Sequence, residues 1–213
     1  EDPVRMIRAI RFKVKLGASI EPVLSKSILK NAHLLENIPP ARLYEEVIKL
    51  FHNEKSTEVL DELSKYDLLR YLFSQTQDDS FIKASLENTS KRIKSGSSVT
   101  PAFLFAVFLW TPLNEKFNAL SKKNKPRIET MIIASEYVIK KQAQQVMMPR
   151  WLSTRVKDVW LMQHQLENCS PKNEKGLINN PRFRMAYDFL VLRSETIDKD
   201  LKPKAEHWTS LQN

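Results

Sequence analysis

The chain opens with the segment Glu1-Asp2-Pro3-Val4-Arg5-Met6-Ile7-Arg8-Ala9-Ile10-Arg11-Phe12-Lys13-Val14-Lys15-Leu16-Gly17. Asp2 is a favourable N-cap, Pro3 suits the first helical position, and Gly17 is a typical helix stop. At about 100° per residue two stripes form: an apolar one of Met6, Ile7, Ile10 and Val14, and a basic one of Arg5, Arg8, Arg11 and Lys15. The segment therefore predicts an amphipathic helix that packs on a core and turns its arginines toward an anion.

Long amphipathic stretches with only 3 glycines in 213 residues continue after this segment, and strand-like alternation is absent from the pattern. The fold class that this predicts is all-α. The expected helices span residues 3–16, about 21–35, 40–53, about 56–66, 81–94, a segment from Pro101, 128–148, a segment after Pro149, and 182–195. A polar segment at 74–80 predicts a boundary between two domains, 1–75 and 76–213.

Composition narrows the class of protein further. The net charge of +9 and an isoelectric point near 9.6 favour a polyanionic partner, most simply a nucleic acid. A single cysteine, Cys169, predicts neither a disulfide framework nor a zinc site and suits a reducing cytoplasm. The longest apolar run, residues 101–110, is too short to span a membrane and predicts a buried helix instead.

A second patterned block runs from Pro39 to Leu50. Arg42, Glu46 and Lys49 are spaced four and three residues apart, so they share one face of a helix and can form a ladder of charges. Another face of the same helix carries the residues expected to be buried, Leu43, Val47 and Leu50.

These two blocks resemble motifs of the bacterial tRNA nucleotidyltransferase and poly(A) polymerase superfamily. Glu-Asp-x-x-Arg followed by Met-x-Arg-Ala-x-Arg-Phe is similar to the segment that reads the nucleobase, and 39–50 is similar to the neck helix. The resemblance implies that Asp2 and Arg5 form a template for the incoming nucleotide, with Glu1 orienting Arg5 one turn away. It gives Arg8 a weaker role at the ribose or phosphates. Accepting and donating groups of this kind match the pairing edge of adenine.

The resemblance gives the second block a bracing role. Arg42, Glu46 and Lys49 are expected to hold the helix that carries Arg5 and not to contact the substrate.

Three later blocks resemble the body of bacterial poly(A) polymerases, not of the CCA-adding relatives. They are the Pro-Ala-Phe-Leu-Phe-Ala segment from Pro101, the Pro-x-x-Leu segment that leads to Asp158-x-Trp160, and the segment from Pro181 to Asp188. The implied architecture is a helical neck over 1–75 and a helical RNA-binding body over 76–213. Most aromatic residues of these blocks are expected to be core anchors: Phe103, Phe105, Trp110 and Trp160.

Candidates for RNA contact in the body are basic residues. Arg182 and Arg184 lie near an expected helix N-terminus beside Lys172 and Lys175, where phosphate binding is favourable. Lys122 and Lys123 lie in a basic loop that is either a phosphate contact or a solvated linker.

No residues for the chemical step are found in the sequence. Nucleotidyl transfer requires carboxylates that hold divalent metal ions, and the family places them in a strand-bearing head with a Gly-Ser turn and an Asp-x-Asp pair. No strand-rich region that could hold such a turn and pair is found, and the four histidines lack ligand spacing. We therefore expect no catalytic residue and no metal ligand here, and Mg²⁺ and ATP would both require an absent head domain.

The expected function is that of the C-terminal part of a polynucleotide adenylyltransferase, which adds AMP from ATP to RNA 3′ ends in polyadenylation and RNA decay. This part would select the ATP base and bind RNA, and would be inactive alone. Expected partners are RNA 3′ ends, ATP, the catalytic head and the RNA-decay machinery, in the cytoplasm and without a membrane. The alternatives are a tRNA CCA-adding enzyme and a non-catalytic helical RNA-binding or adaptor protein.

Overall fold

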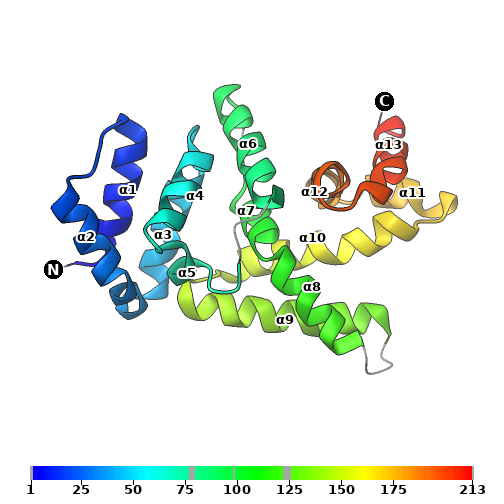
Figure 1. The fold of residues 1–213 in the computed structure, drawn as a ribbon. Coiled ribbons are helices and arrows are strands. Elements are labelled where there is room, and N and C mark those ends of the chain that lie inside the picture. The colour runs from blue at the N-terminus through cyan, green and yellow to red at the C-terminus, as the bar shows by residue number, and fades with distance from the viewer. Residues whose placement is uncertain (1, 77–79, 98, 122–125, 213) are drawn as a thin grey trace. The chain divides into compact units, whose positions relative to one another are not determined.

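The computed structural model describes residues 2–76, 80–97, 99–121 and 126–212, which form helices joined by loops (Figure 1). No strand occurs within these ranges, so the all-α prediction is confirmed. Lys122 and Lys123 of the basic loop lie outside the described residues. The helices pack into two compact units, which are taken in turn below.

The first unit comprises Glu1–Asp78, Leu86–Val99 and Ile139–Met148. It contains six complete elements: α1 (Val4–Leu16), α2 (Pro22–Asn31), the 3-10 helix η1 (Ala32–Asn37), α3 (Pro40–Phe51), α4 (Ser56–Lys65) and α5 (Leu69–Leu72). The ends of two further helices belong to it, α6 (Ser80–Lys94) and α9 (Arg127–Gln145). We expected a linear division at residue 75, whereas this unit is discontinuous because α6 and α9 each contribute residues to both units.

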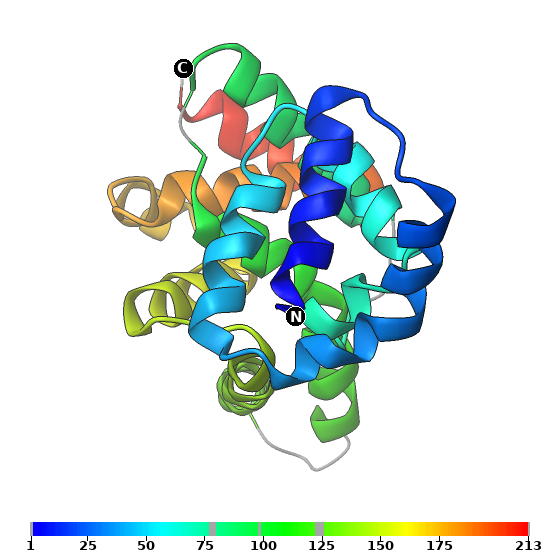
Figure 2. The ribbon, with the colours of Figure 1, turned by 90° about the vertical axis from the view of Figure 1, so that its left-hand side faces the viewer.

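Helix α1 has the ends that its sequence predicts. The backbone N–H of Val4 donates to Asp2 Oδ1 at 3.2 Å, so Asp2 caps a helix that begins one residue later than expected. At the other end Gly17 has φ of 65°, a left-handed conformation that glycine adopts at little cost. In Figure 2, α1 is the dark blue helix next to α3 in lighter blue.

The core of this unit lies where α1, α3 and α4 meet. Its buried side chains are Val4, Ile7 and Ile10 from α1, Leu43, Val47 and Leu50 from α3, and Val59, Leu60 and Leu63 from α4. The predicted burial of the α3 residues is confirmed. Met6 and Val14 from the predicted apolar stripe of α1 are only half-buried, because they flank the buried line of Val4, Ile7 and Ile10.

The second expected helix, over about 21–35, proved too long. Helix α2 ends at Asn31, and η1 continues the chain with tighter turns. Ile38 then adopts an extended conformation ahead of Pro39 and Pro40, as the residue before a proline pair is expected to do.

The second unit comprises Asp79–Ser85, Thr100–Val138 and Pro149–Asn213. Besides its parts of α6 and α9 it contains α7 (Pro101–Phe108), α8 (Trp110–Ser121), α10 (Arg150–Asn168), α11 (Pro171–Ile178), α12 (Phe183–Thr196), the 3-10 helix η2 (Lys199–Leu201) and α13 (Lys202–Ser210). The central helix is α10, which packs against α7 and against α12 (Figure 1). Helix α13 packs on α12.

The apolar run 101–110 forms the end of one helix and the start of another. Helix α7 ends at Phe108 and α8 begins at Trp110. Pro112 lacks the N–H that a continuous helix would donate to the carbonyl of Phe108, so the helix is interrupted there.

Aromatic residues hold the core of the second unit, as predicted. Phe105, Trp110 and Trp160 are buried, and the Trp160 indole N–H donates to the Ala106 carbonyl at 3.1 Å. Phe103 is half-buried, with its ring 6.0 Å from that of Phe189. Because the rings of Phe103 and Trp110 lie edge-to-face with Phe189 and Trp160 is held by a hydrogen bond, these residues fix the packing more than apolar contact alone would.

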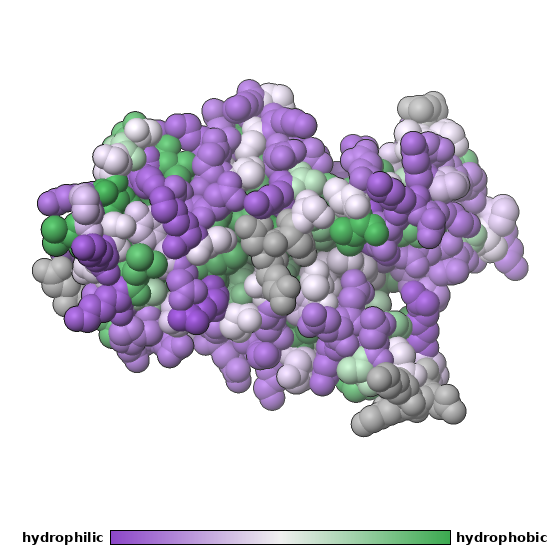
Figure 3. Space-filling view, in the orientation of Figure 1, coloured by the Kyte–Doolittle hydropathy of each residue, from purple (hydrophilic) through white to green (hydrophobic). Residues whose placement is uncertain are grey.

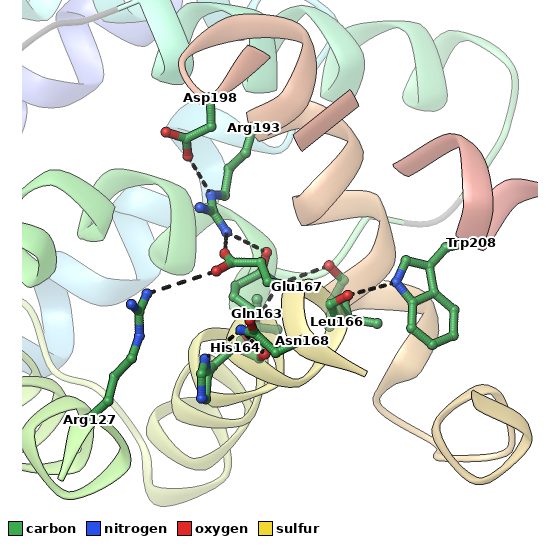
Figure 4. Close-up of polar contacts among 11 residues, drawn as sticks. Arg127, Gln163, His164, Leu166, Glu167, Asn168, Arg193, Asp198 and Trp208 are labelled. Carbon is green, nitrogen blue, oxygen red and sulfur yellow. Dashed lines mark hydrogen bonds and ion pairs between the residues drawn. The ribbon is translucent and has the colours of Figure 1, made fainter. Parts of the chain in front are cut away.

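A buried arginine connects α12 to α10 in this unit (Figure 4). Arg193 donates through Nη1 to Glu167 Oε1 at 2.8 Å and to Gln163 Oε1 at 3.1 Å, and through Nε to Asp198 Oδ2 at 2.8 Å. Its Cζ lies 4.6 Å from the centroid of the Trp110 ring. The guanidinium charge is therefore compensated by two carboxylates and an aromatic face, as a buried cation requires.

We expect Arg193→Leu to lower the free energy of unfolding by about 2–3 kcal/mol, because the carboxylates of Glu167 and Asp198 lose their shared partner. The matched control is Arg184→Leu, which removes an exposed pair with Asp188 one turn away and should cost under about 1 kcal/mol. Urea titration of both variants measures the difference. Equal losses would contradict the structural role of Arg193.

Candidate functional site

The first group of site residues lies at the N-terminus of α1. Asp2 is half-buried, and its carboxylate caps the helix through Oδ1 while Oδ2 forms an ion pair with Arg42 Nη2 from α3. Burial opposes ionisation of Asp2, but the Val4 N–H and the Arg42 guanidinium outweigh it and lower the pKa of this carboxyl below its ordinary value. Asp2 is therefore a carboxylate at neutral pH, held in one orientation from two sides.

Arg5 lies one turn beyond Asp2 and is exposed on α1. Its backbone N–H donates to the Asp2 carbonyl at 3.1 Å, so both residues belong to the first turn. Glu1, which we expect to orient Arg5, lies outside the described residues. The structure thus places Asp2 and Arg5 together at the first turn of α1, and their joint use on a nucleobase stays a prediction.

A second group joins the next turn of α1 to the middle of α3. Glu46 is only 1% exposed, and its Oε1 accepts from Arg8 Nη2 at 2.9 Å, from Arg8 Nε at 3.2 Å and from Lys49 Nζ at 3.3 Å. Burial raises the pKa of the Glu46 carboxyl, but the hydrogen bonds from Arg8 and Lys49 outweigh it and leave the pKa below its ordinary value. A buried carboxylate with two cationic partners fixes α3 against α1.

The expected ladder along α3 is therefore formed only in part. Glu46 and Lys49 pair within the helix, whereas Arg42 reaches across to Asp2 and Glu46 reaches across to Arg8. Arg8, which we expect near the ribose or phosphates, has a side chain 42% exposed and uses its guanidinium on Glu46. Both ion pairs connect α3 to the first turns of α1, as a bracing role requires.

Sequence spacing could not reveal these cross-helix pairs, because their members are about forty residues apart. The same holds for two other links between α1 and its neighbours. Lys13 forms an ion pair with Glu62 of α4, and Lys55 Nζ donates to the Val14 carbonyl at 3.0 Å. A cation at the C-terminus of α1 suits the helix dipole.

The basic candidates of the second unit occupy α11 and α12. Lys172 and Lys175 are exposed on α11, which packs against α12. Arg182 precedes the first residue of α12, and its Nε donates to Asp158 Oδ2 of α10 at 3.0 Å. Arg184 is exposed and pairs with Asp188 at 3.2 Å. Lys122 and Lys123 lie outside the described residues.

The donor set of the described chain does not fit a divalent metal ion. No group of three histidine, cysteine, aspartate or glutamate side chains comes together in the parts of the chain that the structure describes. The two carboxylates of the α1–α3 contact, Asp2 and Glu46, are already committed to arginine and lysine partners. Among the described helices, none combines the length and apolar character that a membrane crossing demands.

Two family models match the chain. "Probable RNA and SrmB-binding site of polymerase A" matches residues 17–79, and "Polymerase A arginine-rich C-terminus" matches residues 123–213.

Curated relatives match over its full length. The chain is 33% identical to Poly(A) polymerase I of Salmonella typhi and covers 48% of that protein, with 100% of the chain aligned. It is 32% identical to Poly(A) polymerase I of Haemophilus influenzae, again over 100% of the chain and 49% of that protein. The CCA-adding enzyme of Bacillus cereus is 35% identical over only 41% of the chain and 22% of its own length. The chain thus spans about half the length of the polymerases that it matches.

The Glu46 contact predicts a dependence of stability on pH. The pKa of Glu46 is lower in the folded chain than in the unfolded chain, so its ionisation stabilises the folded state. This contribution to the free energy of unfolding is complete above the ordinary carboxyl pKa of about 4.3, and it is lost as pH falls through the lowered pKa of the folded chain. Glu46→Gln should therefore reduce the free energy of unfolding by about 2 kcal/mol at pH 7, with the difference shrinking below about pH 4.

Chemical denaturation at a series of pH values measures this difference. Glu45→Gln is the matched control, because Glu45 is the exposed neighbour on the same helix. A difference between wild type and Glu46→Gln that does not change with pH would contradict the ion-pair origin of the effect.

Proposed function

Because the chain belongs to the polymerase A family across both matched segments, we propose that it is the C-terminal part of a polynucleotide adenylyltransferase. The parent enzyme adds AMP from ATP to RNA 3′ ends. The observation that carries this proposal is the alignment of the whole chain with Poly(A) polymerase I, in contrast with the partial alignment of CCA-adding enzymes. The metal-dependent chemistry belongs to a catalytic head outside this chain in this proposal. It is supported by the finding that no three potential ligand side chains come together in the described residues.

Base selection falls to Asp2 and Arg5 in this proposal, with Glu1 orienting Arg5. A carboxylate has about four acceptor positions, and Asp2 uses one for the Val4 N–H and one for Arg42. The remaining positions accept the N6 amino group of adenine while Arg5 donates to N1. A base with these donors and acceptors exchanged leaves both protein groups unpaired, which is a strong basis for discrimination.

Arg42, Glu46 and Lys49 support this template without contacting the base. Arg42 holds the Asp2 carboxylate, and Glu46 holds Arg8 on the following turn of α1. Such support lowers the cost of ordering the template when ATP binds. Arg8 keeps a weaker role toward the ribose or phosphates.

RNA binds to basic side chains of the second unit in this proposal. The candidates are Lys172, Lys175, Arg182 and Arg184, together with Lys122 and Lys123 of the basic loop. Contacts of this kind release counterions, so affinity falls as salt rises. Localisation in the cytoplasm and participation in mRNA processing and RNA decay follow from the same proposal, and the family model over residues 17–79 names an RNA and SrmB site.

In the full-length enzyme, Arg5→Ala should lower kcat/KM for ATP at least tenfold, because one of the two groups that read the base is lost. Affinity for the RNA primer should stay within about twofold, since Arg5 does not contact RNA. The measurements are ATP incorporation into a labelled primer and primer binding in the absence of ATP.

The matched control is Arg11→Ala, two turns further along the same helix. Equal losses of ATP use and of primer affinity for Arg5→Ala would place Arg5 in the structure and not in the base site. Incorporation of CTP by the intact wild-type enzyme would favour the CCA-adding alternative.

The chain of 213 residues alone should bind single-stranded RNA and incorporate no AMP. Binding should weaken with salt, with a slope of about 0.7 in log affinity against log salt for each phosphate contacted. Incorporation of radiolabelled ATP tests for polymerase activity, and RNA binding at three salt concentrations tests the expected salt dependence. Robust tailing by this chain would overturn the proposed division of labour.

A further inference from the structure

Trp151 differs from the other tryptophans in its environment. All four tryptophans lie in the described part of the chain, and three of them, Trp110, Trp160 and Trp208, are buried in the second unit. Trp151 is 46% exposed in the first turn of α10. Its neighbours Leu152 and Val156 already supply the buried side of this part of α10. The indole of Trp151 therefore leaves much of its surface in solvent.

A basic side chain lies beside this exposed ring. The Cζ atom of Arg155 lies 5.5 Å from the centroid of the Trp151 ring, within the range of a cation–π contact. Arg150, directly before Trp151, is exposed as well. An exposed aromatic ring with a cation beside it suits a ligand that is itself both aromatic and anionic.

The same face of α10 continues toward Arg182. Trp151, Arg155 and Asp158 are spaced four and three residues apart, so they lie along one face of the helix, over about 10 Å at 1.5 Å per residue. Asp158 accepts from Arg182 at 3.0 Å, which places that guanidinium beside the end of this line. The resulting surface, here called the α10 face, consists of Trp151, Arg155 and the Asp158–Arg182 ion pair.

The charge of the α10 face selects among possible occupants. The face drawn in Figure 3 is mainly hydrophilic, with smaller hydrophobic areas between. On the α10 face one indole lies beside Arg155, with the half-exposed guanidinium of Arg182 further along, paired with Asp158. An exposed ring with neighbouring cations is a poor match for an apolar protein partner and a good match for a polyanion with planar bases. Double-stranded RNA hides its bases within the stack, whereas a single strand presents them.

We infer that the α10 face is a stacking site for single-stranded RNA, with a base on the Trp151 ring and the adjoining phosphates at Arg155 and Arg182. This inference rests on the proposed function and deepens it, because it assigns a base contact where the proposal has only phosphate contacts. Stacking is tolerant of sequence since every base has a planar face. The site therefore holds the strand without reading its sequence.

The test measures binding of a labelled single-stranded oligoadenylate to the 213-residue chain by fluorescence anisotropy. Trp151→Leu should weaken binding about tenfold and leave the salt slope unchanged, because no charge is removed. Trp151→Phe should recover most of the affinity. Arg155→Ala should weaken binding and reduce the salt slope by about 0.7, the value for one phosphate of a single strand.

Intrinsic fluorescence gives a second readout without a mutation. Trp151 is the exposed emitter among the four tryptophans, so oligoadenylate should quench the solvent-accessible part of the emission and protect it from acrylamide. Thr154→Ala is the uncharged control on the same exposed part of α10, and Lys202→Ala is the charge control on α13. A duplex RNA should bind wild type and Trp151→Leu equally.

The outcomes separate the two proposals. If wild type binds oligoadenylate and Trp151→Leu binds it equally well with no quenching in wild type, the stacking site is overturned while the proposed function stands. If wild type binds no RNA at all, the RNA-binding part of the proposed function fails and the stacking site fails with it.

Discussion

The buried carboxylate of Glu46 is the constraint on which the first unit depends. A carboxylate that is only 1% exposed is stable in its ionised form only when cationic side chains pair with it. Glu46 has two such partners, Lys49 on the same helix and Arg8 on α1. Because an arginine donates in a fixed planar geometry, the contact sets the rotation of α1 as well as its distance from α3. The orientation of the first turn, with Asp2 and Arg5, follows from that rotation.

The second unit uses the same physical principle with the charges reversed. There the buried group is the cation Arg193, and Gln163, Glu167 and Asp198 come to it from α10 and from the segment after α12 (Figure 4). Apolar packing alone tolerates small rotations of one helix on another. A buried charge tolerates them poorly, because each displaced hydrogen bond exposes an uncompensated ion to a medium of low dielectric constant. In both units, one buried ionic group makes helix packing specific.

The charges that remain outside these two clusters account for the basic surface. Arg8, Arg42 and Arg193 are used in holding helices together, while Lys172, Lys175, Arg155 and Arg184 stay at the surface of the second unit. A net charge of +9 therefore describes two different populations of basic residues. Composition alone does not separate the second population from the first.

The amino-acid sequence by itself determined the helical fold, the start and stop of α1 at Asp2 and Gly17, and the burial of Leu43, Val47 and Leu50, because these depend on local propensity and on helical periodicity. It also supplied the motifs that led to the family. The partners of Arg42 and Arg8 and the mixed membership of α6 and α9 were decided by tertiary structure. Contacts between residues forty positions apart cannot be predicted from sequence spacing. The sequence also does not distinguish the exposed Trp151 from the buried Trp160. Only packing decides which of two similar side chains faces the core and which is left to meet a ligand.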